Sequence, residues 1–200
     1  MALANTGLTE NSVQKLMIDA GVIYKNLTFT TETGFTGDLL GATQGGVEIN
    51  IEKKYRKIEV DGTKGRSVKG LEVVDEETAT LKATLLEMTA DNLALSAGGR
   101  VLETSQFSGY DQIEGKYTVD EDDYISNFGI VGNLSNGKKI IFIFDNVLIT
   151  SALNIKLEDG KEGAVELEGT SHATFDQLNA GTSNWRILTP SGETTDVQEG

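Results

Sequence analysis

The chain has 200 residues, which is enough for one domain with a sizeable core. It has no cysteine, which excludes disulfides and thiolate metal sites, and its single histidine, His172, excludes a histidine-rich zinc site. A net charge of −14 disfavours sequence-reading DNA binding. The longest strongly apolar run, Ile140 to Phe144, is far shorter than the roughly 20 residues of a membrane span, and no secretory signal is visible, so no membrane partner is expected.

Composition predicts a mainly β chain. The sequence holds 23 glycines and one proline among many Thr, Val and Ile residues, a mixture typical of strands joined by tight turns. We expect residues 1–12 to form an N-terminal arm, 13–188 a single β domain and 189–200 a flexible polar tail. Within residues 13–30, two apolar patches on either side of Gly21 predict the first strand, straight or bent.

Residues 47–88 predict one long hairpin. Apolar and polar side chains alternate cleanly over residues 47–52 (VEINIE), as in a strand with one buried face. The alternation slips after Tyr55, which predicts a bulge near Arg56–Lys57. A polar loop with three glycines follows over residues 61–70, and residues 71–88 return as the second strand.

The second half of the chain predicts one short helix and further strands. Residues 89–97 form the helix, with Thr89 or Asp91 as its N-cap, and glycines break residues 101–135 into irregular strands. Asn136-Gly137 is a strong hairpin signal, and the KKIIFIF segment after it is apolar on both faces and therefore central. Residues 147–157 and 164–175 alternate around a turn at 159–163, which predicts another hairpin.

No motif indicates catalysis or a cofactor. Three acidic clusters lack the spacing of a calcium loop, and the glycine-rich segment 41–46 lacks the lysine and the following helix of a phosphate-binding loop. His172 lies within a predicted strand, where a packed or surface role is far commoner than catalysis, and Trp185 is expected in the core. We therefore expect no enzyme, no metal and no cofactor.

Charge is distributed unevenly along the chain. Residues 47–70 carry seven basic and four acidic side chains, whereas residues 101–200 carry six basic and 17 acidic ones. The basic segment is either a solvated strand face or a finger that reaches an acidic surface on another copy. Sheet edges are commonly blunted by proline, and none precedes Pro190, although Lys53, Lys54 and Lys57 could serve instead. Unprotected edges make pairing with partners possible.

The hairpin segments LLGATQGGVEINIEKKYRKIEVDGTKG and KGLEVVDEETATLKATLLEMTADNL closely resemble the major tail proteins, or tail tube proteins, of long-tailed bacteriophages. The segments LMIDAGVIYKN and IFDNVLITSALNIKLEDGKEGAVELEGTSHAT are similar to the same family. The resemblance spans residues 13–188 and consists of several matching segments rather than a catalytic signature. The same architecture occurs in contractile tails, tailocins and type VI secretion tubes.

The resemblance implies two packed antiparallel sheets, in a sandwich- or barrel-like arrangement, with one short flanking helix and a long hairpin loop. It implies a structural virion protein without enzymatic activity, which assembles in the bacterial cytoplasm into stacked hexameric rings that form a tube for DNA. Tape measure, tail terminator and baseplate or tail-tip proteins are the implied partners besides other copies of the chain. The implied inter-ring loop consists of Asp61, Gly62, Thr63, Lys64, Gly65, Arg66, Ser67, Val68, Lys69 and Gly70.

The polar side of the first hairpin is our candidate for the lining of the tube. Six subunits with four strands each would close a barrel about 48 Å across, wide enough for a duplex. An acidic lining would repel phosphates, so DNA would pass without binding. The candidate lumen-facing residues are Glu48, Asn50 and Glu52 together with Thr80, Lys82 and Thr84. The alternative is that this face meets bulk water on a monomer.

Two other functions remain open. A receptor- or carbohydrate-binding β-sandwich of the same kind of particle would gather aromatic side chains on one exposed face, whereas the few aromatics here look dispersed and mostly buried. The other alternative is an enzyme, for example a hydrolase that uses His172, the single histidine.

Overall fold

The computed structural model describes residues 8–9 and 12–191. The predicted arm, 1–12, and tail, 189–200, lie for the most part outside these residues. The described strands are β1 (Met17–Thr30), β2 (Gly34–Leu39), β3 (Thr43–Lys57), β4 (Glu72–Leu85), β5 (Gly99–Val101), β6 (Ile113–Gly115), β7 (Tyr124–Leu134), β8 (Lys139–Ile149), β9 (Val165–Ser171) and β10 (Trp185–Leu188). The helices are α1 (Ala90–Ala97) and α2 (Phe175–Ala180), with 3-10 turns at Val13–Lys15 and Glu121–Asp123.

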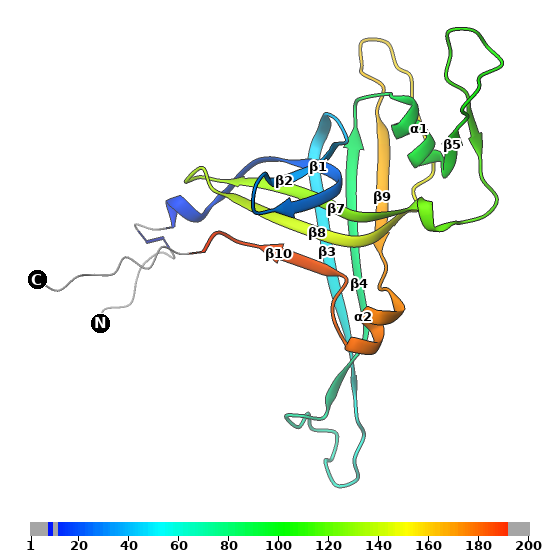
Figure 1. The fold of residues 1–200 in the computed structure, drawn as a ribbon. Coiled ribbons are helices and arrows are strands. Elements are labelled where there is room, and N and C mark those ends of the chain that lie inside the picture. The colour runs from blue at the N-terminus through cyan, green and yellow to red at the C-terminus, as the bar shows by residue number, and fades with distance from the viewer. Residues whose placement is uncertain (1–7, 10–11, 192–200) are drawn as a thin grey trace, which may run out of the picture.

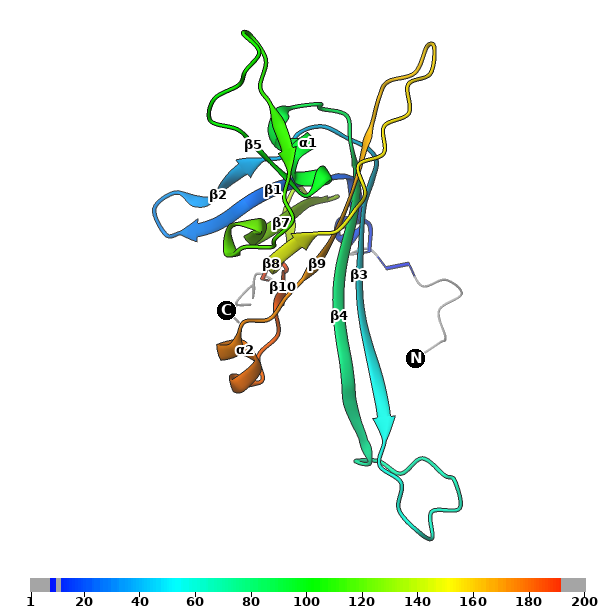
Figure 2. The ribbon, with the colours of Figure 1, turned by 90° about the vertical axis from the view of Figure 1, so that its right-hand side faces the viewer.

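The mainly β fold is confirmed. Eight strands form one antiparallel sheet in the order β2-β1-β7-β8-β9-β4-β3, β10 also pairs with β8, and β5 and β6 form a separate pair. The large sheet turns on itself between β8 and β9, so that β3, β4 and β9 lie across β1, β7 and β8 (Figures 1 and 2). The two packed layers that were expected are therefore hydrogen-bonded to each other at one side.

Strand β8 changes neighbours at the turn between the layers. Its first half pairs with β10 from Ile141 to Phe144, and its end pairs with β9 from Val147 to Ile149. Asn146 lies at the change with a φ of 48°, a left-handed conformation that asparagine tolerates better than most residues. Because β7 pairs along the whole other side of β8, the prediction that this strand is central is confirmed.

The core lies between the two layers. Leu81 and Leu85 of β4 and Leu167 of β9 are completely buried in one cluster with Phe128 of β7 and Phe144 of β8. Each such side chain contributes about 1.5–3 kcal/mol relative to exposure. Trp185 packs against this cluster but is only partly buried, so it lies at the border of the core rather than within it. The core thus fixes β3, β4 and β9 with one face inward and the opposite face outward.

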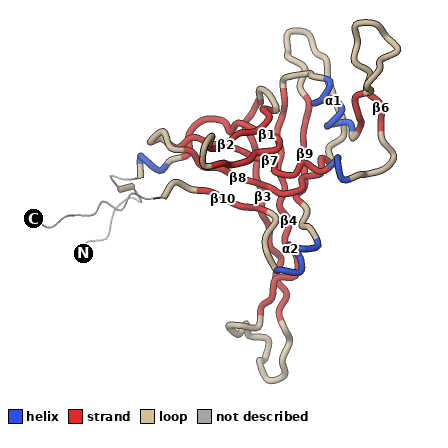
Figure 3. Tube along the Cα trace, in the orientation of Figure 1, coloured by secondary structure: helices blue, strands red, loops and turns tan. Residues whose placement is uncertain are grey.

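Three local expectations need correction, and Figure 3 shows the two that concern a loop and a helix. Residues 150–157 form a loop rather than the predicted strand. The N–H groups of Thr150 and Ser151 donate to the Glu168 carbonyl of β9, and the strand pairing of this segment ends there. The register near the tip shifts between Lys54 and Tyr55, where the extra residue is Asp75 on β4, rather than near Arg56–Lys57 on β3. A second helix, α2, is present beyond the single one expected, with a capping box formed by Thr174 and Gln177.

Candidate assembly surfaces

The β3–β4 hairpin projects from the body of the protein (Figure 1). The two strands pair from Thr43 and Leu85 at the base to Lys57 and Glu72 near the tip. Strand β9 supports β4 only from Thr80 to Leu85, so the hairpin is two-stranded beyond that point. Residues 58–71 form the tip, where the Ile58 N–H donates to the Leu71 carbonyl at 2.7 Å. The ten predicted loop residues, 61–70, all lie in this tip, and nine of them are exposed.

The basic side chains on the shaft of the hairpin have partners within the chain. Lys53 and Lys54 bind Glu77 and Glu76, each at 2.7 Å, across the ladder. Arg56 binds Asp75 at 3.1 Å in the same way. The hydrogen bonds that Lys53 and Lys54 donate to Glu77 and Glu76 raise the pKa values of the two lysines. The acidic side chains of β4 thus neutralise the basic side chains Lys53, Lys54 and Arg56 of β3. The expected basic finger is therefore limited to the tip.

The basic side chains of the tip differ from those of the shaft. Lys57, the last residue of β3, donates to the carbonyls of Gly65 and Arg66 and so closes the base of the loop. Among the described residues, Lys64, Arg66 and Lys69 have no ion-pair partner. Ile58, Val60 and Val68 expose apolar side chains beside them. The tip thus offers positive charge and apolar surface at the same place.

The six candidate lumen residues share one face of the sheet. Glu48 lies opposite Lys82 and Asn50 opposite Thr80, while Glu52 and Thr84 continue the same sides of β3 and β4. The structure adds a third strand to this face, because Lys82 also lies opposite Glu168 of β9 and binds its carboxylate at 2.9 Å. That hydrogen bond is the main cause of a raised Lys82 pKa. The resulting polar face combines β3, β4 and β9.

Sequence reasoning missed the contribution of β9 to the polar face. Glu166 and Glu168 alternate with the buried Val165 and Leu167, so their outward orientation could be predicted from the sequence. Their place beside β4 could not, because about 80 residues separate the paired positions.

Several strand edges of the large sheet are open. Within the described part of the chain, β3 pairs only with β4, and β2 pairs only with β1. The open edge of β3 is 15 residues long and contains no proline. Unpaired backbone groups along such an edge are available to a strand of another chain.

Exposed apolar side chains are widespread. They include Met17, Leu39, Tyr55, Val74, Tyr110 and Leu157. The expectation that most aromatics are buried is wrong, because seven of the 13 aromatic side chains are exposed. They lie on β1 and β2, on the hairpin, between β5 and β7, and on α2 rather than on one face. This dispersal matches several contact surfaces better than one ligand-binding face.

His172 follows the end of β9 and packs edge-on against Tyr124, with ring centroids 5.4 Å apart. It lines a hollow of about 670 Å³ together with Phe175 and Leu178 of α2. Its Nδ1 atom is buried, and no described side chain or backbone group hydrogen-bonds to it. Ser126 and Glu121 line the same hollow, but among the described residues no hydrogen bond joins the His172 ring to a serine or a carboxylate, as a catalytic triad requires.

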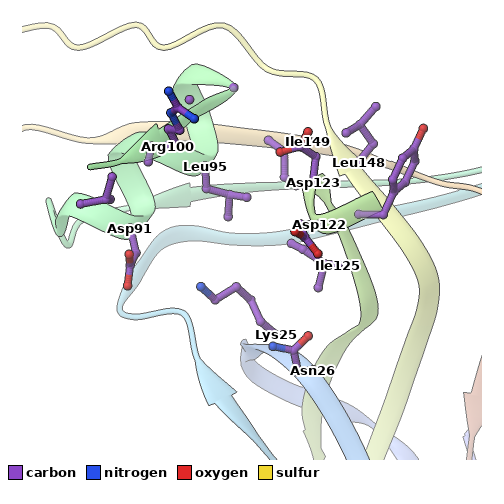
Figure 4. A pocket seen from close by; sticks show the side chains of 15 residues that line it. Lys25, Asn26, Asp91, Leu95, Arg100, Asp122, Asp123, Ile125, Leu148 and Ile149 are labelled. Carbon is purple, nitrogen blue, oxygen red and sulfur yellow. The ribbon is translucent and has the colours of Figure 1, made fainter. Parts of the chain in front are cut away.

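A second hollow lies between α1, the end of β1 and the start of β7 (Figure 4). Its volume is about 450 Å³, and its rim carries Lys25 and Arg100 as well as Asp91 and Asp122. Because basic and acidic side chains line the same hollow, its charge favours neither an anionic nor a cationic ligand. No group of three or more His, Asp or Glu side chains in the described part of the chain is arranged to hold a metal ion.

No helix among the described residues is long and apolar enough to cross a membrane.

Neither a protein-family model nor a curated protein matches the chain. Similar solved structures include a chain in the virion of a native gene transfer agent particle, with 12% identity and a TM-score of 0.35. Another is a chain in the tail of an empty gene transfer agent particle with C6 symmetry, with 14% identity and a TM-score of 0.36. Each match covers 77% of this chain and 92% of the other chain. Because both TM-scores lie below 0.5, we draw no functional conclusion from them.

Proposed function

We propose that the protein is a structural subunit of a phage-like tail. Copies join through their open sheet edges into rings, and the rings stack into a tube through which DNA passes. The proposal is supported by the sequence resemblance to tail tube proteins. The structural observation that carries it is a surface far too large, and too rich in unpaired edges and apolar side chains, for a protein that works as a single copy.

The excess surface can be estimated. The chain exposes 14706 Å², whereas a compact monomer of 21.5 kDa exposes about 9200 Å². Even fully extended, the eighteen residues that the structure does not describe would account for only about 2800 Å² of the difference. The remainder, about 2700 Å², exceeds the roughly 800 Å² that each partner buries in a standard interface. Each copy therefore has enough surplus surface for more than one neighbour.

The polar face is our candidate for the lining of the tube. Its charges alternate in sign from strand to strand, through Glu48, Lys82 and Glu168, and its other exposed groups are uncharged or acidic. A face of this kind gives phosphates no continuous positive track, so DNA would move along it without being held. Six copies with a charge of −14 each would add a general repulsion of the duplex.

The proposed setting is a virion, with assembly in the bacterial cytoplasm. Copies of the chain itself are the main partners, and tape measure, tail terminator and baseplate or tail-tip proteins are the other proposed ones. The proposed role requires neither an enzymatic activity nor a cofactor.

Electron microscopy of the concentrated protein tests the proposal. We expect rings or tubes with a central channel in negative stain, together with a mass above that of one copy in light scattering. A protein that stays monomeric at millimolar concentration would contradict it. A receptor- or carbohydrate-binding module would instead remain a monomer and show a thermal shift with its ligand.

Removal of charge from the tip tests the role of the loop. The triple variant Lys64→Gln, Arg66→Gln and Lys69→Gln should fold with an unchanged melting temperature, because these side chains have no partners within the described chain. Tube growth should fall at least tenfold. The control Lys15→Gln, Lys25→Gln and Lys139→Gln changes net charge equally, away from the tip. Normal growth of the tip variant would contradict a role for these charges in assembly.

A further inference from the structure

The hairpin tip and two long loops lie at opposite ends of the molecule. The loops are residues 102–112, between β5 and β6, and residues 150–164, between β8 and β9; we call them the cap loops. Figures 1 and 2 show both cap loops at the top and the tip at the bottom, in views that differ by 90°. A tip therefore cannot meet the cap loops of its own chain.

The cap loops expose large apolar side chains. Phe107, Tyr110 and Leu157 are 62%, 76% and 85% exposed, and Leu153 and Ile155 are exposed beside Leu157. Aromatic residues are enriched in the centres of protein interfaces, where they bury a large area. The tip supplies smaller apolar groups, Ile58, Val60 and Val68, which could pack against them.

The charges of the two ends are opposite. The cap loops carry five acidic and two basic side chains, and both basic ones, Lys156 and Lys161, bind Glu158. No described basic side chain pairs with the four remaining carboxylates, Glu103, Asp111, Asp159 and Glu162. The tip carries three basic and two acidic side chains, and its basic ones have no ion-pair partner in the part of the chain that the structure describes. Opposite potentials on two surfaces orient their encounter and favour one register.

We infer that the tip of one copy docks on the cap loops of a second copy. Since the two surfaces differ and lie at opposite ends, the contact is head-to-tail and leaves a free tip and a free cap on each pair. Repetition then builds a column rather than a closed dimer. This inference rests on the proposed function and assigns the surface that receives the hairpin, which the sequence did not indicate.

Cross-linking tests the inference directly, because the chain has no cysteine of its own. Single variants Arg66→Cys in the tip and Asp159→Cys in the cap loops are mixed, assembled and treated with a short bis-maleimide. We expect a cross-linked dimer in the mixture and at least tenfold less in either variant alone. Glu32→Cys, in the exposed turn between β1 and β2, replaces Asp159→Cys in the control mixture and should give no more dimer than the single variants.

Charge exchange provides an independent readout. Lys64→Glu, Arg66→Glu and Lys69→Glu in the tip should abolish stacking, and so should Glu103→Lys, Asp111→Lys and Asp159→Lys in the cap loops. Mixing the two triple variants should restore contacts between reversed tips and reversed caps, which gives mixed stacks.

The outcomes separate the inference from the proposed function. If the wild-type protein never assembles, both fail. If it forms rings and tubes but Arg66→Cys cross-links to Glu32→Cys as well as to Asp159→Cys, or the mixed triple variants do not stack, the proposed function stands and the cap loops are not the receiving surface. Selective cross-linking to Asp159→Cys together with restored stacking supports the inference.

Discussion

Glu77 joins the hairpin to the body of the protein. Its carboxylate accepts hydrogen bonds from Lys53 at 2.7 Å, from Ser183 at 2.9 Å and from the Trp185 indole. The hydrogen bond from Lys53 is the largest cause that lowers the Glu77 pKa, and the bonds from Ser183 and Trp185 act in the same direction against partial burial. One side chain thus holds β3, β4 and the start of β10 together.

The lowered pKa of Glu77 predicts a loss of stability in acid. Because the pKa is lower in the folded state than the ordinary value of 4.5, the stabilisation is complete above pH 4.5 and is lost as the pH falls through the folded value. Glu77→Gln should lower the free energy of unfolding at pH 7 by about 1 kcal/mol. Its melting temperature should also fall less steeply in acid than that of the wild type.

Thermal unfolding followed from about pH 7 to pH 3 measures this difference. Glu76→Gln is a matched control, because Lys54 is the single basic partner of Glu76 among the described residues and the Glu76 side chain is 53% exposed. It should leave the melting temperature at pH 7 nearly unchanged. Equal effects of the two substitutions would show that Glu77 does not link the hairpin to β10.

At the scale of elements, helices and turns that are specified by adjacent residues were predicted better than features that depend on residues far apart in the chain. The helix at residues 89–97 was correctly predicted because its signals are adjacent: the Thr89 side chain accepts from the Asn92 N–H, and Gly98 ends the helix in the left-handed conformation. The turn at Asn136-Gly137 and the alternation of β3 are similarly local. Helix α2 carried the same kind of signal in Thr174, Gln177 and Gly181, and could have been predicted.

The expectations that failed depend on neighbours far away in the chain. Residues 150–157 alternate like a strand, but a strand also needs a paired neighbour, and the pairing of this segment with β9 ends at the backbone bonds from Thr150 and Ser151 to Glu168. The change of neighbour at Asn146 and the addition of β9 to the polar face are likewise set by packing between distant segments. The candidate site was predicted where it lies within one hairpin and missed where another strand completes it.

Glycine at position 129 in β7 allows close packing against β1. A Cβ atom there would lie 2.4 Å from Cδ2 and 2.8 Å from Cβ of Leu27, which is buried. We predict that Gly129→Ala lowers the free energy of unfolding by about 1–3 kcal/mol through overpacking. Leu27→Ala should cost about 2–5 kcal/mol by leaving a cavity.

Urea unfolding of the two single variants and the double variant measures the coupling. The double variant should be less destabilised than the sum of the two, because the added methyl group occupies part of the space that Leu27 leaves. Additive effects would show that the two residues do not share this contact.

At the scale of the whole molecule, charge acts in two opposite ways. Each copy has a net charge of −14, so copies side by side repel one another, while the basic tip and the acidic cap loops attract. Salt weakens both the repulsion between copies and the attraction between tip and cap loops, since the Debye length falls from about 30 Å at 0.01 M to about 3 Å at 1 M.

Ionic strength should therefore separate ring formation from stacking. On raising sodium chloride from about 0.02 M to about 0.5 M, we expect rings to form at lower protein concentration and tubes to become shorter. Light scattering and tube lengths in negative stain measure the two effects. Tubes that lengthen steadily with salt would contradict an electrostatic contribution of the tip to stacking.

The ladder between β4 and β9 also determines how such an assembly would bear tension. A pull on the tip would pass along β3 and β4 and enter the body where Thr80 to Leu85 pair with Thr170 to Val165. Antiparallel hydrogen bonds lie perpendicular to their strands, so this pull would load them in shear, all together rather than one after another. A filament linked through its hairpins should consequently be stiff, and it should rupture abruptly instead of unravelling.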